Sequence, residues 1–217
     1  MKSEETGVRS QESGGEAGSR RGRSTFTVVT GGARSGKSRF AEELARDGQQ
    51  PVLYVATAEA GDDEMRARIQ MHRQQRPDDW MTLEARTDVG KTLASLTAPP
   101  GTVLLDDLGL LVTNRLLDLC GPHDPAAETA HALDAEIEAE IDALETARKT
   151  GGWDAIVVTN EVGLGIVPAT PLGRVFRDAL GRANQLLAAR ADAVYLLVAG
   201  LPVRVKPACE HLTGDLR

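Results

Sequence analysis

The chain has 217 residues, of which 41% are hydrophobic and only 3% aromatic, and its formal net charge is -7. This length suits one domain with a well-buried core, which must be built mainly from Val, Leu, Ile and Ala. The negative charge argues against a nucleic-acid-binding surface, which is normally basic, and no apolar run approaches the roughly 18–20 residues of a membrane span.

The cysteines and the termini indicate a cytoplasmic protein without a zinc site. Cys120 and Cys209 lie far apart, with no CxxC motif or Cys/His cluster, which fits a reducing cytoplasm. The N-terminus has no hydrophobic segment of the signal-peptide type. We expect a disordered tail over residues 1–24, where apolar side chains are almost lacking, a folded domain over residues 25–206, and a C-terminal tail over residues 207–217.

A phosphate-binding loop follows the apolar run that begins at Phe26. Residues 31–38 read GGARSGKS, which fits Gly, any four residues, Gly-Lys-Ser between a strand pattern and a helix pattern. Glycines let backbone N–H groups surround phosphate oxygens, and the N-terminus of the new helix favours negative charge. Lys37 is predicted to contact the β- and γ-phosphates and Ser38 to ligate Mg²⁺. The alternative is a Gly-rich turn without a ligand, but pattern and context together favour nucleotide binding.

Strand and helix patterns alternate through the rest of the chain. We expect strands at Val52–Ala56, Thr102–Leu105, Asp154–Thr159 and Ala193–Val198, with short ones at Trp80–Glu84 and Leu201–Val205. We expect helices at Asp62–Gln75, Leu108–Leu119, Ala126–Lys149 and Leu172–Arg190. This alternation predicts a single α/β domain with a mainly parallel sheet and helices on both faces.

Two acids come directly after the Thr102–Leu105 strand. An acid at the end of a buried strand can hold Mg²⁺ or its water shell opposite a phosphate loop, and we assign Asp106 to this role. The competing interpretation is that an acid here only caps the next helix, and we assign Asp107 to that cap. The two assignments are compatible.

Two further features fit either chemistry or packing. His72 shares one face of the Asp62–Gln75 helix with Met65 and Ile69. A neutral imidazole is a competent nucleophile towards phosphorus. A histidine on an apolar helix face is, however, more often structural. The apolar loop at Asn160–Pro168 follows a strand at the sheet edge where ligands bind in α/β proteins, yet a packed connection is equally consistent.

A phosphate loop with an acid after a buried strand is typical of three classes: GTPase switches, ATPase motors, and phosphoryl- or nucleotidyltransferases. The Asn-Lys-x-Asp motif of guanine-specific switches is absent, and motors belong to longer chains or assemblies. The small acidic domain therefore favours a transferase that acts on a small molecule.

Three segments together resemble one family much more specifically than the phosphate loop alone. They read TGGARSGKS, DDEMRARIQMHRQQRP, and VVTNEVGLGIVP followed by RVFRDALGRANQLLA. From Phe26 to Lys206 the chain is similar to the bifunctional adenosylcobinamide kinase/adenosylcobinamide-phosphate guanylyltransferases of cobalamin biosynthesis. Such enzymes phosphorylate the aminopropanol hydroxyl of adenosylcobinamide with ATP or GTP, then transfer GMP from GTP through a guanylylated histidine and release pyrophosphate. The resemblance also implies a RecA-like P-loop core and a homotrimer.

The resemblance assigns roles to individual residues. His72 is the implied nucleophile, and Lys37 is the second implied catalytic residue. The implied nucleotide-binding residues are Gly31, Gly32, Ala33, Arg34, Ser35, Gly36, Lys37, Ser38, Ala56, Thr57, Ala58, Arg73, Gln74, Gln75, Arg76, Glu84 and Asp106. Arg73 and Arg76 can neutralise charge that builds on the α-phosphate and pyrophosphate. We expect the Glu161–Pro168 loop and a subunit interface to contact the corrinoid.

Two positions depart from the family pattern. Family members commonly have His-His where this chain has Met71-His72, and Glu where it has Asp106. The later histidine matches the nucleophile, so the change at Met71 is expected to spare activity, and Asp106 reaches about one methylene less, through a water. Two rival functions stay open: a monofunctional P-loop kinase for a small molecule, with His72 structural, and a non-catalytic GTP-binding regulator, which the missing guanine motif disfavours.

Overall fold

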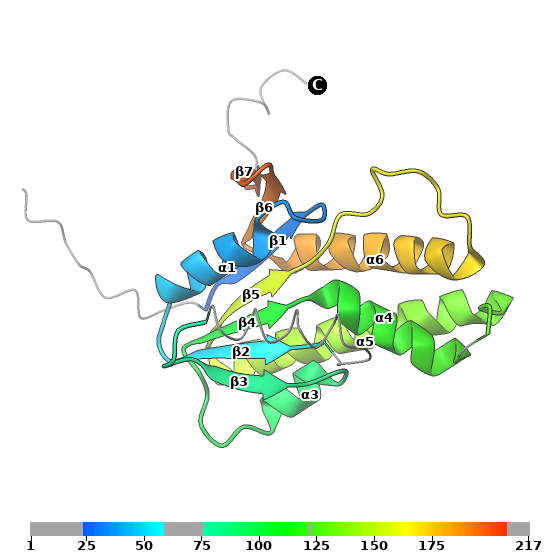
Figure 1. Ribbon diagram of the computed structural model, residues 1–217. Coiled ribbons are helices and arrows are strands. Elements are labelled where there is room, and N and C mark those ends of the chain that lie inside the picture. The colour runs from blue at the N-terminus through cyan, green and yellow to red at the C-terminus, as the bar shows by residue number, and fades with distance from the viewer. Residues whose placement is uncertain (1–23, 59–75, 122, 208–217) are drawn as a thin grey trace, which may run out of the picture.

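Seven strands form one sheet in the computed structural model, which describes residues 24–58, 76–121 and 123–207. The strands are β1 (Phe26–Gly31), β2 (Val52–Ala56), β3 (Met81–Glu84), β4 (Thr102–Asp106), β5 (Asp154–Val158), β6 (Ala193–Val198) and β7 (Leu201–Lys206). The helices of the described residues are α1 (Lys37–Arg46), α3 (Val89–Ala94), α4 (Leu108–Cys120), α5 (Ala127–Gly151) and α6 (Pro171–Arg190). Helix α1 covers one face of the sheet, and α3 to α6 cover the other (Figure 1).

The strand order brings the predicted site residues to one edge of the sheet. The order is β3-β2-β4-β5-β1-β6-β7, and every neighbouring pair is parallel except β6 and β7. One strand, β5, separates β1, which leads into the phosphate loop, from β4, which ends in Asp106. This is the strand order of RecA-like P-loop proteins, so the predicted fold class is confirmed. Because parallel strands end at the same edge, the loop and Asp106 lie together there.

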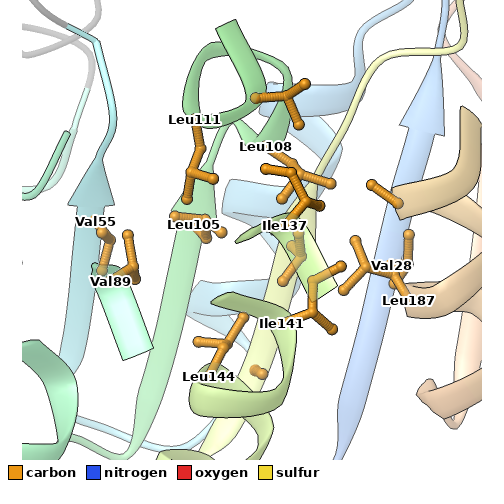
Figure 2. Packing of buried hydrophobic residues seen from close by; sticks show 14 of the residues in the cluster. Val28, Val55, Val89, Leu105, Leu108, Leu111, Ile137, Ile141, Leu144 and Leu187 are labelled. Atoms are coloured by element: carbon orange, nitrogen blue, oxygen red, sulfur yellow. The ribbon is translucent and has the colours of Figure 1, made fainter. Parts of the chain in front are cut away.

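Both faces of the central strands are buried by aliphatic side chains. Val28 and Val29 point to opposite faces of β1, yet each is at most 2% exposed. Val28 belongs to the larger cluster with Leu105 of β4, Ile137 of α5 and Leu187 of α6 (Figure 2). The smaller cluster beneath α1 contains Val29, Ala41, Ala45, Tyr54 and Leu104. Burial on both faces explains why these strands are almost continuously apolar.

The predicted elements that fall within the described residues are found within two residues of their expected bounds. The helix expected at Asp62–Gln75 lies outside the described residues. Ser24, which we assigned to the N-terminal tail, accepts hydrogen bonds from Nη1 of Arg148 through its carbonyl oxygen (2.9 Å) and its hydroxyl (2.7 Å). Ser24 is therefore in contact with the folded domain. None of the helices described here has the length and apolar character needed to cross a membrane.

Helix α3 was not predicted, and it is held by contacts from distant parts of the chain. Its N-cap residue, Asp88, has a φ of 54° and makes no side-chain cap. Instead, the Glu140 carboxylate of α5 accepts hydrogen bonds from the backbone N–H groups of Asp88 (3.0 Å) and Gly90 (3.3 Å). Arg115 of α4 donates to the same carboxylate at 2.9 Å. Glu140 thus joins three helices on one face of the sheet.

Candidate nucleotide-binding site

The phosphate loop depends on two glycines that no other residue could replace without strain. Gly36 has a φ of 93°, a conformation that residues with a Cβ rarely adopt. A Cβ on Gly31 would lie 2.6 Å from the Ser35 hydroxyl and 2.8 Å from the Leu197 carbonyl oxygen. The backbone closes the turn through a hydrogen bond from Ser35 N–H to the Gly32 carbonyl oxygen (3.3 Å).

The loop and the start of α1 place several hydrogen-bond donors close together. Gly36, at the N-cap of α1, makes no side-chain cap, so the first amides of the helix are available to an anion. The hydroxyl of Ser35 is buried and finds no hydrogen-bond partner among the described residues. Lys37 is buried at the start of α1, and its Nζ donates to the Gly32 carbonyl oxygen at 3.3 Å. These groups form a cradle of positive charge and N–H donors that suits phosphate.

A cavity of about 580 Å³ opens in front of the loop, a size typical of small-molecule sites. It is lined by Ala33, Arg34, Ser35, Gly36, Lys37, Ser38, Arg39, Tyr54, Ala56, Ala58, Arg76, Asp106, Asp107, Gly109, Leu110, Thr113, Asn160 and Phe176. Ten of the predicted nucleotide-binding residues are therefore brought together around one space.

Asp106 faces the phosphate loop across this cavity. Its Oδ1 lies 3.5 Å from the hydroxyl oxygen of Ser38, and its Oδ2 accepts a hydrogen bond from the Tyr54 hydroxyl at 2.8 Å. A carboxylate and a hydroxyl are hard oxygen ligands of the kind that Mg²⁺ uses. No cluster of three or more His, Cys, Asp or Glu side chains in the described residues could hold a metal alone. This donor set fits Mg²⁺, which takes one or two protein ligands beside phosphate oxygens and waters.

Asp107 caps α4, as predicted. Its Oδ1 accepts a hydrogen bond from Leu110 N–H at 2.7 Å, and its Oδ2 accepts one from the Asn160 side chain at 3.2 Å. Burial raises the pKa of the Asp107 carboxyl, and the neighbouring charge of Asp106 adds to this effect. The two consecutive acids therefore have different partners: Asp106 contacts Tyr54 and Ser38, and Asp107 contacts Leu110 and Asn160.

Arg76 lies over the ring of Tyr54 at the cavity wall. The guanidinium carbon is 3.4 Å from the ring centroid, close enough for a cation–π contact. Its Nε and Nη1 atoms are buried and have no hydrogen-bond partner among the described residues. A phosphate oxygen in the cavity would supply the acceptor that these two N–H groups lack.

Several predicted residues do not line the cavity. The Thr57 hydroxyl donates to the Asp107 carbonyl oxygen (2.8 Å) and accepts from the Asp107 N–H (3.1 Å), so Thr57 supports the start of α4. Glu84 ends β3, opposite Ala56 of β2. Gly31 and Gly32 shape the loop. The predicted nucleophile His72, the nucleotide contacts Arg73, Gln74 and Gln75, and the departure at Met71 lie outside the described residues.

Sequence reasoning missed part of the cavity lining. The residues not predicted to be there are Arg39, Tyr54, Asp107, Gly109, Leu110, Thr113, Asn160 and Phe176. Tyr54 has one available signal, because it shares its strand face with Ala56 two residues later. Asn160 directly follows β5 at the carboxyl edge, so the ligand-edge interpretation of the loop that starts there already pointed to this position.

The loop after β5 is fixed at both ends and exposes its apolar residues. Glu161 accepts hydrogen bonds from the N–H groups of Gly163 and Leu164, and Arg174 of α6 donates to the carbonyl oxygens of Pro168 and Ala169. Between these ends, the side chains Leu164 (87%), Ile166 (96%) and Val167 (61%) are largely exposed. These three side chains are therefore not packed against the described part of the chain, whereas Val162 at the start of the loop contacts the core.

Known proteins resemble this chain along most of its length. A family model described as cobinamide kinase / cobinamide phosphate guanyltransferase matches residues 27–205. Two relatives named bifunctional adenosylcobalamin biosynthesis protein CobU, from Escherichia coli and Salmonella typhimurium, are 47% and 46% identical over 179 residues, which cover 82% of this chain and 98% of each relative. The bifunctional adenosylcobalamin biosynthesis protein CobP of Pseudomonas aeruginosa is 41% identical over 179 residues, covering 82% of this chain and 96% of that protein.

Among solved structures, a RadB recombinase resembles the fold with a TM-score of 0.44 and 17% identity, covering 79% of this chain and 73% of that chain. A likeness this weak adds nothing to the strand order, on which the fold assignment rests. The family model, in contrast, spans β1 to β7, including the phosphate loop and the acid opposite it. The chain belongs to the cobinamide kinase / cobinamide phosphate guanyltransferase family.

Proposed function

We propose that this chain is a bifunctional transferase that phosphorylates the aminopropanol hydroxyl of adenosylcobinamide with ATP or GTP and then attaches GMP from GTP. In the first step the hydroxyl oxygen attacks the γ-phosphorus, and the nucleoside diphosphate leaves. In the second step His72 attacks the α-phosphorus of GTP, and pyrophosphate leaves. An oxygen of the corrinoid phosphate then displaces His72 and gives adenosylcobinamide-GDP.

The observation that carries this proposal is the meeting of Lys37, Ser38 and Asp106 in one cavity of a chain from this family. The uncapped amides of α1 and the Lys37 ammonium supply positive charge where the phosphates bind. Ser38 and Asp106 would hold Mg²⁺, which when bound neutralises charge on the phosphate oxygens. Arg76 adds two N–H donors at the cavity wall.

His72 enters the proposal through its match to the family nucleophile and through chain connectivity. A chain advances at most about 3.6 Å per residue, so positions 72 and 76 are separated by at most about 14 Å. Arg76 and Ala58 both line the cavity. This sequence distance supports a nucleophile that works on a nucleotide in the same site.

The corrinoid is proposed to bind beside the cavity, against the loop of residues 161–168. Leu110 and Phe176 give the cavity apolar lining, and the loop begins next to Asn160. Replacing Leu164 and Ile166 together with Ser should raise the KM for adenosylcobinamide about tenfold or more, because apolar contact area is lost, and leave the KM for GTP unchanged. An unchanged corrinoid KM would remove the loop from the substrate site.

The direct test of the proposed function is covalent labelling with Mg²⁺ and α-³²P-GTP, using the wild-type protein and His72→Ala. Label on the wild type alone, stable in alkali and released in acid as a phosphoramidate is, would establish the guanylylated histidine. The same His72→Ala protein should still transfer the γ-phosphate of ATP to adenosylcobinamide, since the first step does not use the nucleophile. An unlabelled wild type that still phosphorylates the corrinoid would leave a monofunctional kinase, and neither product would leave a GTP-binding regulator.

A further inference from the structure

Tyr54 joins two groups of opposite charge at the cavity wall. Its side chain is buried in β2, and the whole residue is only 3% exposed. Its hydroxyl donates to Oδ2 of Asp106 at 2.8 Å, and the guanidinium carbon of Arg76 lies 3.4 Å from its ring centroid. Tyr54 therefore contacts both Asp106, the proposed Mg²⁺ ligand, and Arg76, the proposed phosphate ligand.

The register of the sheet explains how Tyr54 reaches Asp106. Tyr54 pairs with Leu104 across β2 and β4, and Ala56 pairs with Asp106, so all four residues share the face beneath α1. The Asp106 side chain is one diagonal step from Tyr54, which is within reach of a long aromatic side chain. A Phe at position 54 would fill the same apolar cluster. The hydroxyl is therefore not needed for packing, and it donates a hydrogen bond to the Asp106 carboxylate.

This hydrogen bond divides the two oxygens of the Asp106 carboxylate between different roles. Oδ2 is engaged by Tyr54, and Oδ1 is turned to the Ser38 hydroxyl at 3.5 Å. Because a carboxylate oxygen can only accept, the Tyr54 hydroxyl is the donor in this hydrogen bond. Oδ1 is thus the oxygen that is held towards the metal position.

The ring of Tyr54 orients Arg76 in a comparable way. A guanidinium that stacks on an aromatic ring keeps its N–H donors in the plane parallel to the ring. Nε and Nη1 of Arg76 are buried without a hydrogen-bond partner among the described residues. The cation–π contact therefore keeps Arg76 at the cavity wall, where these two donors can serve phosphate oxygens of a bound nucleotide.

We propose that Tyr54 is a positioning residue, which holds Asp106 towards Mg²⁺ through its hydroxyl and Arg76 towards the nucleotide phosphates through its ring. The inference rests on the proposed Mg²⁺-nucleotide site. Tyr54 does not touch the reacting atoms. Its two roles belong to two different parts of the side chain, so Tyr54→Phe removes only the first and Tyr54→Leu removes both.

The experiment measures binding of a fluorescent GTP analogue at increasing Mg²⁺ concentrations and also in EDTA, with no turnover required. Tyr54→Phe should raise the Mg²⁺ concentration for half-maximal tightening about tenfold or more, the usual effect of losing a hydrogen bond to a metal ligand, and leave binding in EDTA unchanged. Tyr54→Leu should also weaken binding in EDTA by roughly three- to tenfold, because the cation–π contact is lost.

Tyr195→Phe is the matched control. Tyr195 packs edge-on against Phe40 on the same face of the sheet, with ring centroids 5.2 Å apart, and it does not line the cavity. The Mg²⁺ dependence of nucleotide binding by Tyr195→Phe should match that of the wild type. A wild-type Mg²⁺ curve for Tyr54→Phe would overturn the inference and leave the proposed function standing. Absence of Mg²⁺-dependent nucleotide binding by the wild type would overturn both. If Tyr54→Leu fails to fold, Tyr54→Phe still decides.

Discussion

Asp106 and Asp107 are consecutive residues whose carboxylates point to different partners. Asp106 contacts Tyr54 and lies near Ser38, whereas Asp107 contacts Leu110 and Asn160. At the scale of single residues, this division lets one carboxylate remain available to a ligand and the other hold the helix behind it. Each acid can therefore be tested separately.

Asp106→Asn should keep the side-chain size and remove the negative charge that would hold Mg²⁺. We expect the rates of both transfer steps to fall by roughly two to three orders of magnitude, the range for loss of one electrostatic contact at a reacting centre. Nucleotide binding in EDTA should persist, because the phosphate loop is intact. Steady-state kinetics with ATP and with GTP measure this, and wild-type rates in the variant would exclude Asp106 as a metal ligand.

Comparing Asp107→Asn with the wild type should show how the ionisation of Asp107 affects the free energy of unfolding. Burial raises the pKa of Asp107 in the folded protein above its usual value of 3.8. The contribution of Asp107 to the free energy of unfolding is therefore fully present below pH 3.8 and is lost as pH rises through the folded-state pKa. Asn caps a helix as well as Asp does and does not ionise, and Asn160 can turn its amide to accept from it. The free energy of unfolding of the variant relative to wild type should therefore increase between pH 4 and pH 7 in urea titrations. A relative stability that falls over this range would contradict the assignment.

At the scale of elements, α3 depends on a carboxylate that lies 52 positions from its N-cap residue, Asp88, in sequence. Glu140 of α5 has a side chain only 5% exposed and accepts from two backbone N–H groups of the α3 region and from Arg115 of α4. Its removal would leave the Arg115 guanidinium and the backbone donors without this acceptor. Glu140 thus links α3, α4 and α5 by polar contacts within an otherwise aliphatic layer on this face of the sheet.

Glu140→Ala should lower the free energy of unfolding by about 3 kcal/mol or more, as expected when one partner of a buried ion pair is removed. Glu138→Ala, an exposed acid on the same helix, should change it by less than about 0.5 kcal/mol. Urea denaturation of the two variants gives the comparison. Equal stabilities for Glu140→Ala and Glu138→Ala would show that the link is not needed for folding.

The contrast between α1 and α3 shows which elements could be predicted from the sequence. Helix α1 follows a local motif in which Gly36, Lys37 and Ser38 carry both the turn and the ligand chemistry. Helix α3 has only six residues, and its capping group comes from Glu140, which has no local pattern to mark it. The same distinction applies to the site, because the loop and Asp106 are local signals. The contacts of Tyr54 arise only when β2 and β4 pair in register.

At the scale of the whole molecule, exposed aliphatic side chains gather on the antiparallel pair at one edge of the sheet. Val198, Leu201, Val203 and Val205 are each at least half exposed. An apolar group of this kind on a soluble surface often marks an interface. We propose that this edge of the sheet is an interface between copies of the chain, in line with the homotrimer that the family resemblance implies.

Light scattering after size-exclusion chromatography should give a mass of three times the 23.1 kDa of the chain. Val203→Glu should shift the mass towards that of one chain, because it places a charge in the proposed interface. The melting temperature of the variant should stay close to that of the wild type if this edge is free in the monomer. A trimeric Val203→Glu would place the interface elsewhere, and a monomeric wild type would remove the trimer proposal.

The position of β1 in the sheet has a consequence for synthesis on the ribosome. Both sheet partners of β1 come late in the chain, since Phe26 pairs with Ala155 and Thr27 pairs with Ala193. Contacts of such long sequence separation form late, because the intervening chain must first be made and closed. The phosphate loop leaves the ribosome early but has neither neighbouring strand until β5 and β6 have followed it. A nascent chain that stops after α5 should therefore fail to bind nucleotide, although it already carries the complete GGARSGKS motif.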